Sequence, residues 1–289
     1  MFTIENEHLK VTVQAKGAEL TRLYHKKNEL DYLWDANPEV WGKHSPVLFP
    51  IVGTLKNNSY QYKGNTYQLG RHGFARDKIF AVDAQTADTI TLVLYSDEET
   101  LKVYPFNFEF RIRYSLYEES LSTAYEVKNT GDDVMYFSVG AHPAFKVPLE
   151  DDAQYTDYYL VFDKLETAPR WPISPDGLIE KEPQPLLEDS NKLMLKKELF
   201  HRDALVLKQI DSSVITFKSD TERHGFRFDF PGFPFLGLWA AKNADFLCIE
   251  PWCGIADSVT SNQQLPDKEG INKLQPQEQF TRTWTVSLF

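Results

Sequence analysis

The chain has 289 residues, a formal net charge of −11 and a hydrophobic fraction of 42%, with 14% aromatic residues. This acidic field repels polyanions, which excludes nucleic acid as a partner. No apolar run reaches the length of a membrane span, so no membrane partner is expected. Undivided all-β domains reach this length, and we expect one domain over residues 1–289. The sequence leaves the oligomeric state open.

Segments with strand character follow one another along the chain. Residues 108–114 alternate apolar and polar side chains, whereas residues 246–249 are almost entirely apolar. The predicted strands, in chain order, are residues 90–95, 108–114, 121–128, 134–139, 159–162, 214–217, 246–249 and 281–288. Turn signals such as Asn129-Thr130-Gly131-Asp132 separate them.

Helical signals are short. Ser96-Asp97-Glu98-Glu99 resembles a capping box, and Pro105 would end the helix that it starts. Residues 196–200 predict another turn or two. The proline-rich segment 169–185 is interpreted as a long surface loop, because strand patterns resume after it. The chain is therefore predicted to be all-β, a large antiparallel β-sandwich of two packed sheets.

The first candidate cluster for chemistry lies at residues 69–76, where Arg71 and Arg76 flank His72 at a bend marked by Gly73. Glycine allows close approach of the backbone to a ligand. The guanidinium groups can bind hydroxyls, carboxylates or phosphates. A strand end whose arginines pair with surface acids explains the pattern equally well.

The second cluster follows the predicted strand 134–139 and contains His142 beside Pro143. A histidine where the chain changes direction can face a cleft, and its ordinary pKa suits a general acid. A histidine that satisfies a buried hydrogen bond is the alternative. Arg223-His224-Gly225 looks like a copy of the first cluster, but its polar neighbours favour an exposed turn.

The third cluster contains Glu250, which is predicted to end the apolar strand, with Pro251 closing it. A carboxylate in such surroundings is costly unless it has partners, and burial would raise its pKa towards the range of a useful base. Trp252 could form a flat apolar wall beside the carboxylate or pack in the core.

The two cysteines, Cys248 and Cys253, do not form a disulfide framework in a chain of this length. The N-terminal residues lack the features of a signal peptide, so a reducing, cytoplasmic location is expected. Zinc is not expected, because no further His or Cys lies near the cysteines at ligand spacing. No phosphate-binding or dinucleotide motif is present, and no cofactor is expected.

Three motifs in order resemble those of the aldose 1-epimerase superfamily: His-Gly-Phe-Ala-Arg at 72–76, Ala-His-Pro-Ala-Phe at 141–145 and Ile-Glu-Pro-Trp-x-Gly at 249–254. The similarity is greatest to its LacX-like branch, near the glucose-6-phosphate 1-epimerases, and residues 46–53 support it. The resemblance implies a galactose mutarotase-like supersandwich with a cleft on one sheet, acting on a small sugar without a cofactor.

The resemblance also implies the roles of individual residues. His142 would be the general acid and Glu250 the general base, on opposite sides of one sugar-sized hollow. The substrate-binding residues would be Arg71, His72, Arg76, Asp203 and Trp252. The phosphosugar branch carries an arginine before its Phe-Pro segment, whereas this chain has Lys43 and His44 there.

The predicted activity is interconversion of the α and β anomers of a hexose by ring opening and closure. Such chemistry needs one acid, one base and groups that hold hydroxyls. The first alternative is a hexose 6-phosphate epimerase, with Arg71, Arg76 and Lys43 at the phosphate. A sugar-binding protein without catalysis is the second. A glycosidase with Glu250 and Asp203 as its carboxylate pair ranks last, because it leaves His142 without a task.

Overall fold

The computed structural model describes residues 1–289 and consists mainly of antiparallel sheets. The nine-stranded sheet has the spatial order β16 (Ser190–Met194), β14 (Tyr158–Glu166), β18 (Val214–Ser219), β19 (Phe226–Asp229), β23 (Gln279–Leu288), β10 (Ser120–Asn129), β9 (Phe108–Tyr117), β8 (Thr89–Tyr95) and β7 (Ala81–Gln85). The six-stranded sheet has the order β12 (Val139–Gly140), β21 (Phe246–Cys253), β20 (Phe235–Trp239), β17 (Leu205–Lys208) and β15 (Arg170–Trp171), with β13 (Ala144–Lys146) also paired to β21.

Smaller elements surround these two sheets. The smaller sheets comprise β1 (Phe2–Glu5), β2 (Leu9–Val13), β3 (Leu20–His25) and β4 (Leu30–Asp31); β5 (Ser59–Tyr62) and β6 (Asn65–Gln68); and β11 (Met135–Phe137) and β22 (Asn272–Leu274). The helices are α1 (Glu98–Val103) and the 3-10 turns η1 (Lys56–Asn58), η2 (Ala75–Asp77), η3 (Tyr155–Asp157), η4 (Lys197–Phe200) and η5 (Leu265–Asp267). None of them has the length and apolar character needed to cross a bilayer.

Strand alternation builds the sandwich core. In β9, Phe108, Phe110 and Ile112 are buried while the residues between them are at least partly exposed. Side chains at every second position share one face of a sheet, so this pattern buries one face of β9. The predicted all-β fold with large antiparallel sheets is confirmed.

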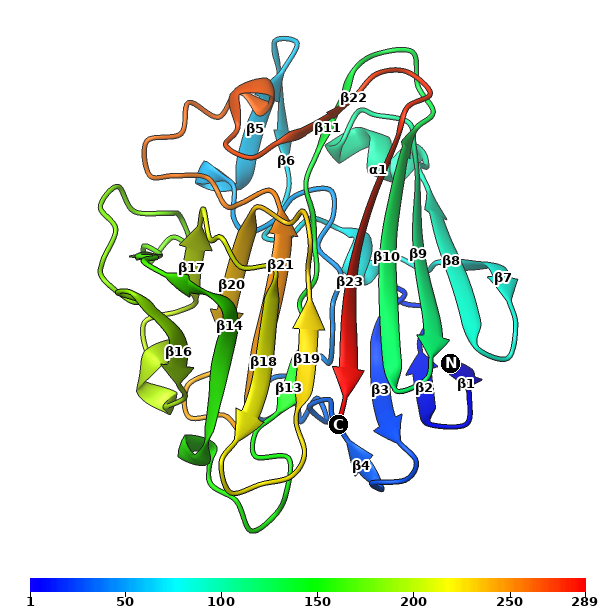
Figure 1. Ribbon diagram of the computed structural model, residues 1–289. Helices are drawn as coiled ribbons and strands as arrows, with labels where there is room; N and C mark the ends of the chain where they lie inside the picture. Colours follow the sequence, from blue (N-terminus) through cyan, green and yellow to red (C-terminus); the bar gives the residue numbers. More distant parts are fainter.

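The two large sheets pack face to face. Phe145 of β13 stacks on Phe226 of β19, with ring centroids 4.2 Å apart. Figure 1 shows β18 and β19 of the nine-stranded sheet in front of β20 and β21. Leu247 and Ile249 of β21 belong to the large buried cluster between the sheets. The core therefore includes one face of the six-stranded sheet.

The opposite face of the six-stranded sheet is also buried. Val206 of β17, Phe235 of β20 and Trp252 of β21 belong to a second, smaller apolar cluster. Because side chains alternate along a strand, the even-numbered residues of β21 lie on this second face. Glu250 is among them, so the carboxylate points away from the sandwich core.

Two strand predictions are wrong in detail. Residues 134–139 do not form one strand: β11 pairs with β22, whereas β12 pairs with β21. β21 does not end at Glu250 but runs through Pro251 to Cys253. A proline lacks an N–H, but it is tolerated here because β12 and β13 are interrupted opposite it, and its carbonyl still accepts from Ala141.

Two loop and helix predictions are also corrected. The N-cap of α1 is Asp97 rather than Ser96, because the Asp97 carboxylate accepts from the Thr100 backbone and the Thr100 hydroxyl reaches back. The segment 169–185 is not only a surface loop. It contains β15, and a bridge between Ile173 and Ile179 folds it back over the second face of the six-stranded sheet.

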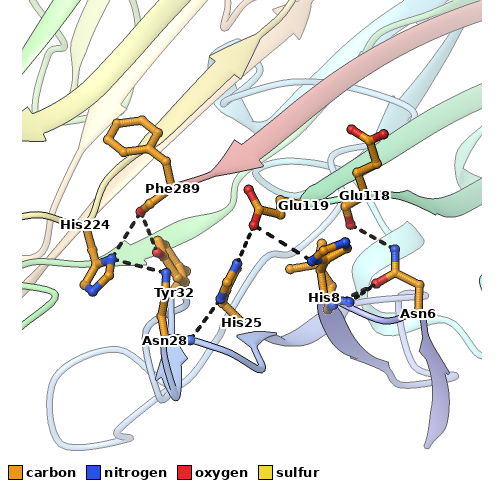
Figure 2. Close-up of polar contacts among 10 residues, drawn as sticks. Asn6, His8, His25, Asn28, Tyr32, Glu118, Glu119, His224 and Phe289 are labelled. Carbon is orange, nitrogen blue, oxygen red and sulfur yellow. Dashed lines mark hydrogen bonds and ion pairs between the residues drawn. The ribbon is translucent and has the colours of Figure 1, made fainter.

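Polar contacts join the N-terminal sheet to the end of β23 (Figure 2). Tyr32 donates from its hydroxyl to the carbonyl of Phe289 over 3.0 Å, and the Asn28 amide lies 3.2 Å from Nδ1 of His224. His224 thus belongs to a structural contact at this edge of the molecule.

Candidate functional site

A cavity of about 310 Å³ opens on the second face of the six-stranded sheet. This volume is within the range of pockets that hold small molecules. The seven site residues singled out in the sequence all line it: Arg71, His72, Arg76, His142, Asp203, Glu250 and Trp252. Residues from four distant parts of the sequence therefore meet at one place.

His142 and Glu250 are direct neighbours in this cavity. The distance from Nε2 of His142 to Oε2 of Glu250 is 3.4 Å. His142 lies in the short interruption between β12 and β13, where the chain leaves the ladder with β21 opposite Glu250. The two groups are side by side, and not on opposite sides of the hollow as the sequence suggested.

Burial shifts the pKa values of this pair in opposite directions. The side chains of His142 and Glu250 are only 10% and 3% exposed. Loss of hydration raises the pKa of Glu250 well above its usual value, and it lowers the pKa of His142 to about 3. Burial thus disfavours a charge on either group.

His72 is held by the backbone of Gly53. The Gly53 N–H donates to Nδ1 of His72 over 3.0 Å, and the His72 N–H donates to the Gly53 carbonyl. Arg71 brings its Nε to 3.2 Å from Nε2 of the same ring. The His72 ring is therefore held between the backbone of Gly53 and the Arg71 guanidinium group.

The bend after His72 requires a glycine. Gly73 has a φ of 71°, and a Cβ at this position would lie 2.6 Å from the carbonyl carbon of Phe49. Glycine reaches this left-handed conformation without steric cost. The tight contact with Phe49 holds the loop that carries His72 against the cavity.

The two arginines differ in their surroundings. Arg71 is about half exposed, and its Nη2 lies 3.7 Å from Oδ1 of Asp203. Arg76 is more buried, and its Nη2 donates to the backbone carbonyl of Arg71 over 2.9 Å. Burial lowers the pKa of Arg76. Arg76 thus braces the loop, whereas Arg71 and Asp203 offer a charged pair at the cavity wall.

Trp252 forms a flat part of the cavity wall because two glycines lie beneath its ring. A Cβ at Gly140 would lie 2.6 Å from Cδ1 of the indole, and a Cβ at Gly237 would lie 2.5 Å from Cη2. Larger residues at either position would lift the ring. A flat apolar surface of this kind can stack against the C–H face of a sugar.

Sequence reasoning missed the aromatic residues around His142. Trp41 stacks on the imidazole with a centroid distance of 5.1 Å, and Trp239 meets it edge-on at 5.6 Å. Both line the cavity. Trp239 ends β20 next to β21, which could have served as a signal, whereas nothing in the local pattern marks Trp41. Lys43, considered for a phosphate site, does not line the cavity.

Cys248 lies beside the acid–base pair. The ligand atoms of His142, Cys248 and Glu250 all lie within 4.8 Å of one another. Cys248 and Cys253 are both free and buried. The fold brings His142 next to Cys248, whereas the residues near the cysteines in the sequence include no such ligand, so the spacing along the chain does not exclude a metal here.

Comparisons with known proteins identify the family of this chain. Residues 1–265 match the model of the aldose 1-epimerase family. The chain is 33% identical to the chromosomal protein LacX of Lactococcus lactis, over 99% of this chain and 98% of that protein. It resembles the structure of a galactose mutarotase related enzyme from Lactobacillus acidophilus, with a TM-score of 0.93, 37% identity, and 100% and 97% of the two chains covered. A galactose mutarotase-like protein from Lactobacillus casei has a TM-score of 0.94 and 30% identity over the full length of both chains.

Proposed function

Because the chain belongs to the aldose 1-epimerase family, we propose that it interconverts the α and β anomers of a neutral hexose, with Glu250 as general base and His142 as general acid. The observation that carries this proposal is the 3.4 Å separation of Nε2 of His142 from Oε2 of Glu250 inside the cavity. The anomeric hydroxyl and the ring oxygen are bonded to the same carbon, so an acid and a base that serve both must lie close together.

Ring opening moves two protons. Glu250 removes the proton of the anomeric hydroxyl, C1 becomes an aldehyde, and the bond from C1 to the ring oxygen breaks. His142 gives its proton to that oxygen. After rotation about the C1–C2 bond, the same groups return both protons, and the ring closes on the other face. Each proton transfer by a positioned group contributes on the order of 10²–10⁴-fold to the rate.

The environment of the pair favours the opening step. The step starts from the form in which the shared proton lies on His142 and Glu250 is ionised, which is a minor form in this buried cavity. After opening, Glu250 is protonated and His142 is neutral. A raised pKa of the carboxyl group and a lowered pKa of the imidazole both favour this state. The pair starts and ends the cycle with the same single proton, so no proton has to come from solvent. The proposed reaction therefore needs no acid or base besides these two side chains.

Two features support a neutral sugar as substrate. Arg71 already has a carboxylate 3.7 Å away in Asp203, so its charge is partly offset. A 6-phosphate group would add charge next to Asp203 and Glu250. Trp252 offers a stacking surface that suits an uncharged pyranose. A hexose 6-phosphate is the alternative substrate, with Arg71 and Arg76 as the cations at the cavity.

The test is exchange between anomers, measured by saturation-transfer NMR on galactose, glucose and glucose 6-phosphate. We expect catalysed exchange on a neutral hexose. Glu250→Gln and His142→Asn should each reduce it by at least about 10²-fold. His224→Asn, which changes a histidine far from the cavity, should leave the rate unchanged.

Each result has a distinct meaning. Full exchange in Glu250→Gln or His142→Asn would refute the acid–base assignment. A preference for glucose 6-phosphate would overturn the neutral substrate but leave the chemistry intact. Binding of sugar without faster exchange would support a non-catalytic sugar-binding protein.

We also propose a cytoplasmic location, which the two free cysteines support.

A further inference from the structure

The thiol of Cys248 lies next to the proposed acid and base. Cys248 precedes Glu250 by two residues on β21, so both point from the same face of the strand. His142 approaches from the interruption between β12 and β13. The ligand atoms of all three lie within 4.8 Å of one another, and nothing in the proposed reaction uses the thiol.

The geometry of this group resembles one edge of a tetrahedral zinc site. Zinc binds imidazole nitrogen at about 2.0–2.1 Å and carboxylate oxygen at about 2.0–2.2 Å, so the two ligand atoms of a tetrahedron lie roughly 3.4 Å apart. The corresponding atoms of His142 and Glu250 are 3.4 Å apart. Nδ1 of His142 is buried without a hydrogen-bond partner, so no second hydrogen bond holds the ring.

The charges of this group also suit a divalent ion. A thiolate and a carboxylate together carry two negative charges, and a neutral imidazole adds none. A Zn²⁺ ion bound by the three is therefore neutral as a unit, which avoids an unpaired buried charge.

We propose that Zn²⁺ binds to His142 Nε2, Cys248 Sγ and Glu250 and thereby inhibits the enzyme. Three protein ligands leave a fourth position that faces the cavity, where water or a sugar hydroxyl binds. The inhibition rests on the proposed function, because the metal occupies the acid and the base. The binding itself does not, because it depends only on the three ligands.

The first experiment detects the metal without reference to activity. Co²⁺ is added to the metal-free protein, and the near-ultraviolet spectrum is searched for the band from sulfur to cobalt. We expect this band in the wild type and in Cys253→Ser, whose thiol lies on the opposite face of β21. It should be absent in Cys248→Ser and in Cys248→Ala. A wild type without the band, or a band that survives in both Cys248 variants, overturns the site.

The second experiment measures zinc inhibition of anomer exchange. The zinc concentration for half inhibition should rise by about 100-fold or more in Cys248→Ser or Cys248→Ala, because even second-shell partners change metal affinity 10–100-fold. Basal exchange in these variants serves as the check on folding, and a chelator should restore the wild type. Equal inhibition of wild type and Cys248 variants refutes the inference. If no exchange is found in any sample, the cobalt spectrum still decides the metal site.

Discussion

Replacement of His142 by Gln tests how strongly burial suppresses a charge in the cavity. The imidazole is nine-tenths buried, and its pKa falls from 6.5 to about 3 on folding. In the unfolded chain the ring binds a proton below about pH 6.5, whereas in the folded chain it stays neutral until about pH 3. The unfolded state therefore binds more protons in this window, and stability falls as the pH drops through it.

The magnitude follows from the width of the window. At about pH 4.5, the unfolded pKa of 6.5 lies two units above the pH, and each unit is worth about 1.4 kcal/mol. His142 should thus destabilise the wild type by about 3 kcal/mol at pH 4.5 relative to about pH 8. His142→Gln lacks this group, so its stability relative to the wild type should rise by about 3 kcal/mol over the same range.

Urea unfolding at the two pH values, followed by tryptophan fluorescence, measures this difference. His201→Gln is the matched control, because it removes an exposed imidazole, and its stability relative to the wild type should change little with pH. A relative stability of His142→Gln that is constant with pH, or that falls on acidification, would contradict the reasoning. Such a result would mean that the ring is protonated in the folded cavity.

Two further predictions concern stability, one at the cavity wall and one at a buried ion pair. Gly237→Ala would place a Cβ 2.5 Å from Cη2 of Trp252. It should lower the free energy of unfolding in urea by about 1–3 kcal/mol and raise KM for the sugar. The control is Gly70→Ala, whose Cβ meets no atom within 4 Å and which should have neither effect. The ion pair of Lys268 and Asp257 spans 2.7 Å with both side chains 3% exposed, so Lys268→Met alone should cost about 3–5 kcal/mol by leaving a buried carboxylate unpaired. The double variant with Asp257→Asn should recover much of that loss, and a double variant as unstable as the single one would count against the explanation.

The fold was largely predictable from the sequence because its long strands are half-buried. Residues 108–114 alternate strictly, and the structure has β9 there. Prediction failed where neighbouring strands, and not local pattern, decide the structure. Pro251 reads as a strand end, yet β21 continues through it because the strands opposite are interrupted at that point.

The candidate site was predictable only in part. The motifs around His72, His142 and Glu250 were visible from their resemblance to a family, and all three residues line the cavity. Trp41 and Cys248 were not, because each reaches His142 only through the folded arrangement of distant segments. Sequence spacing also cannot tell whether an acid and a base face each other across a ligand or stand side by side.

The two faces of β21 have different tasks: one packs in the core between the sheets, and the other contributes to the cavity. Ile249 belongs to the core between the sheets, and the next residue, Glu250, belongs to the cavity. Substitution of Ile249 should therefore lower the yield of folded protein, whereas substitution of Glu250 should spare the yield and alter the chemistry. The two phenotypes meet at neighbouring residues because successive side chains of a strand point to opposite faces of the sheet.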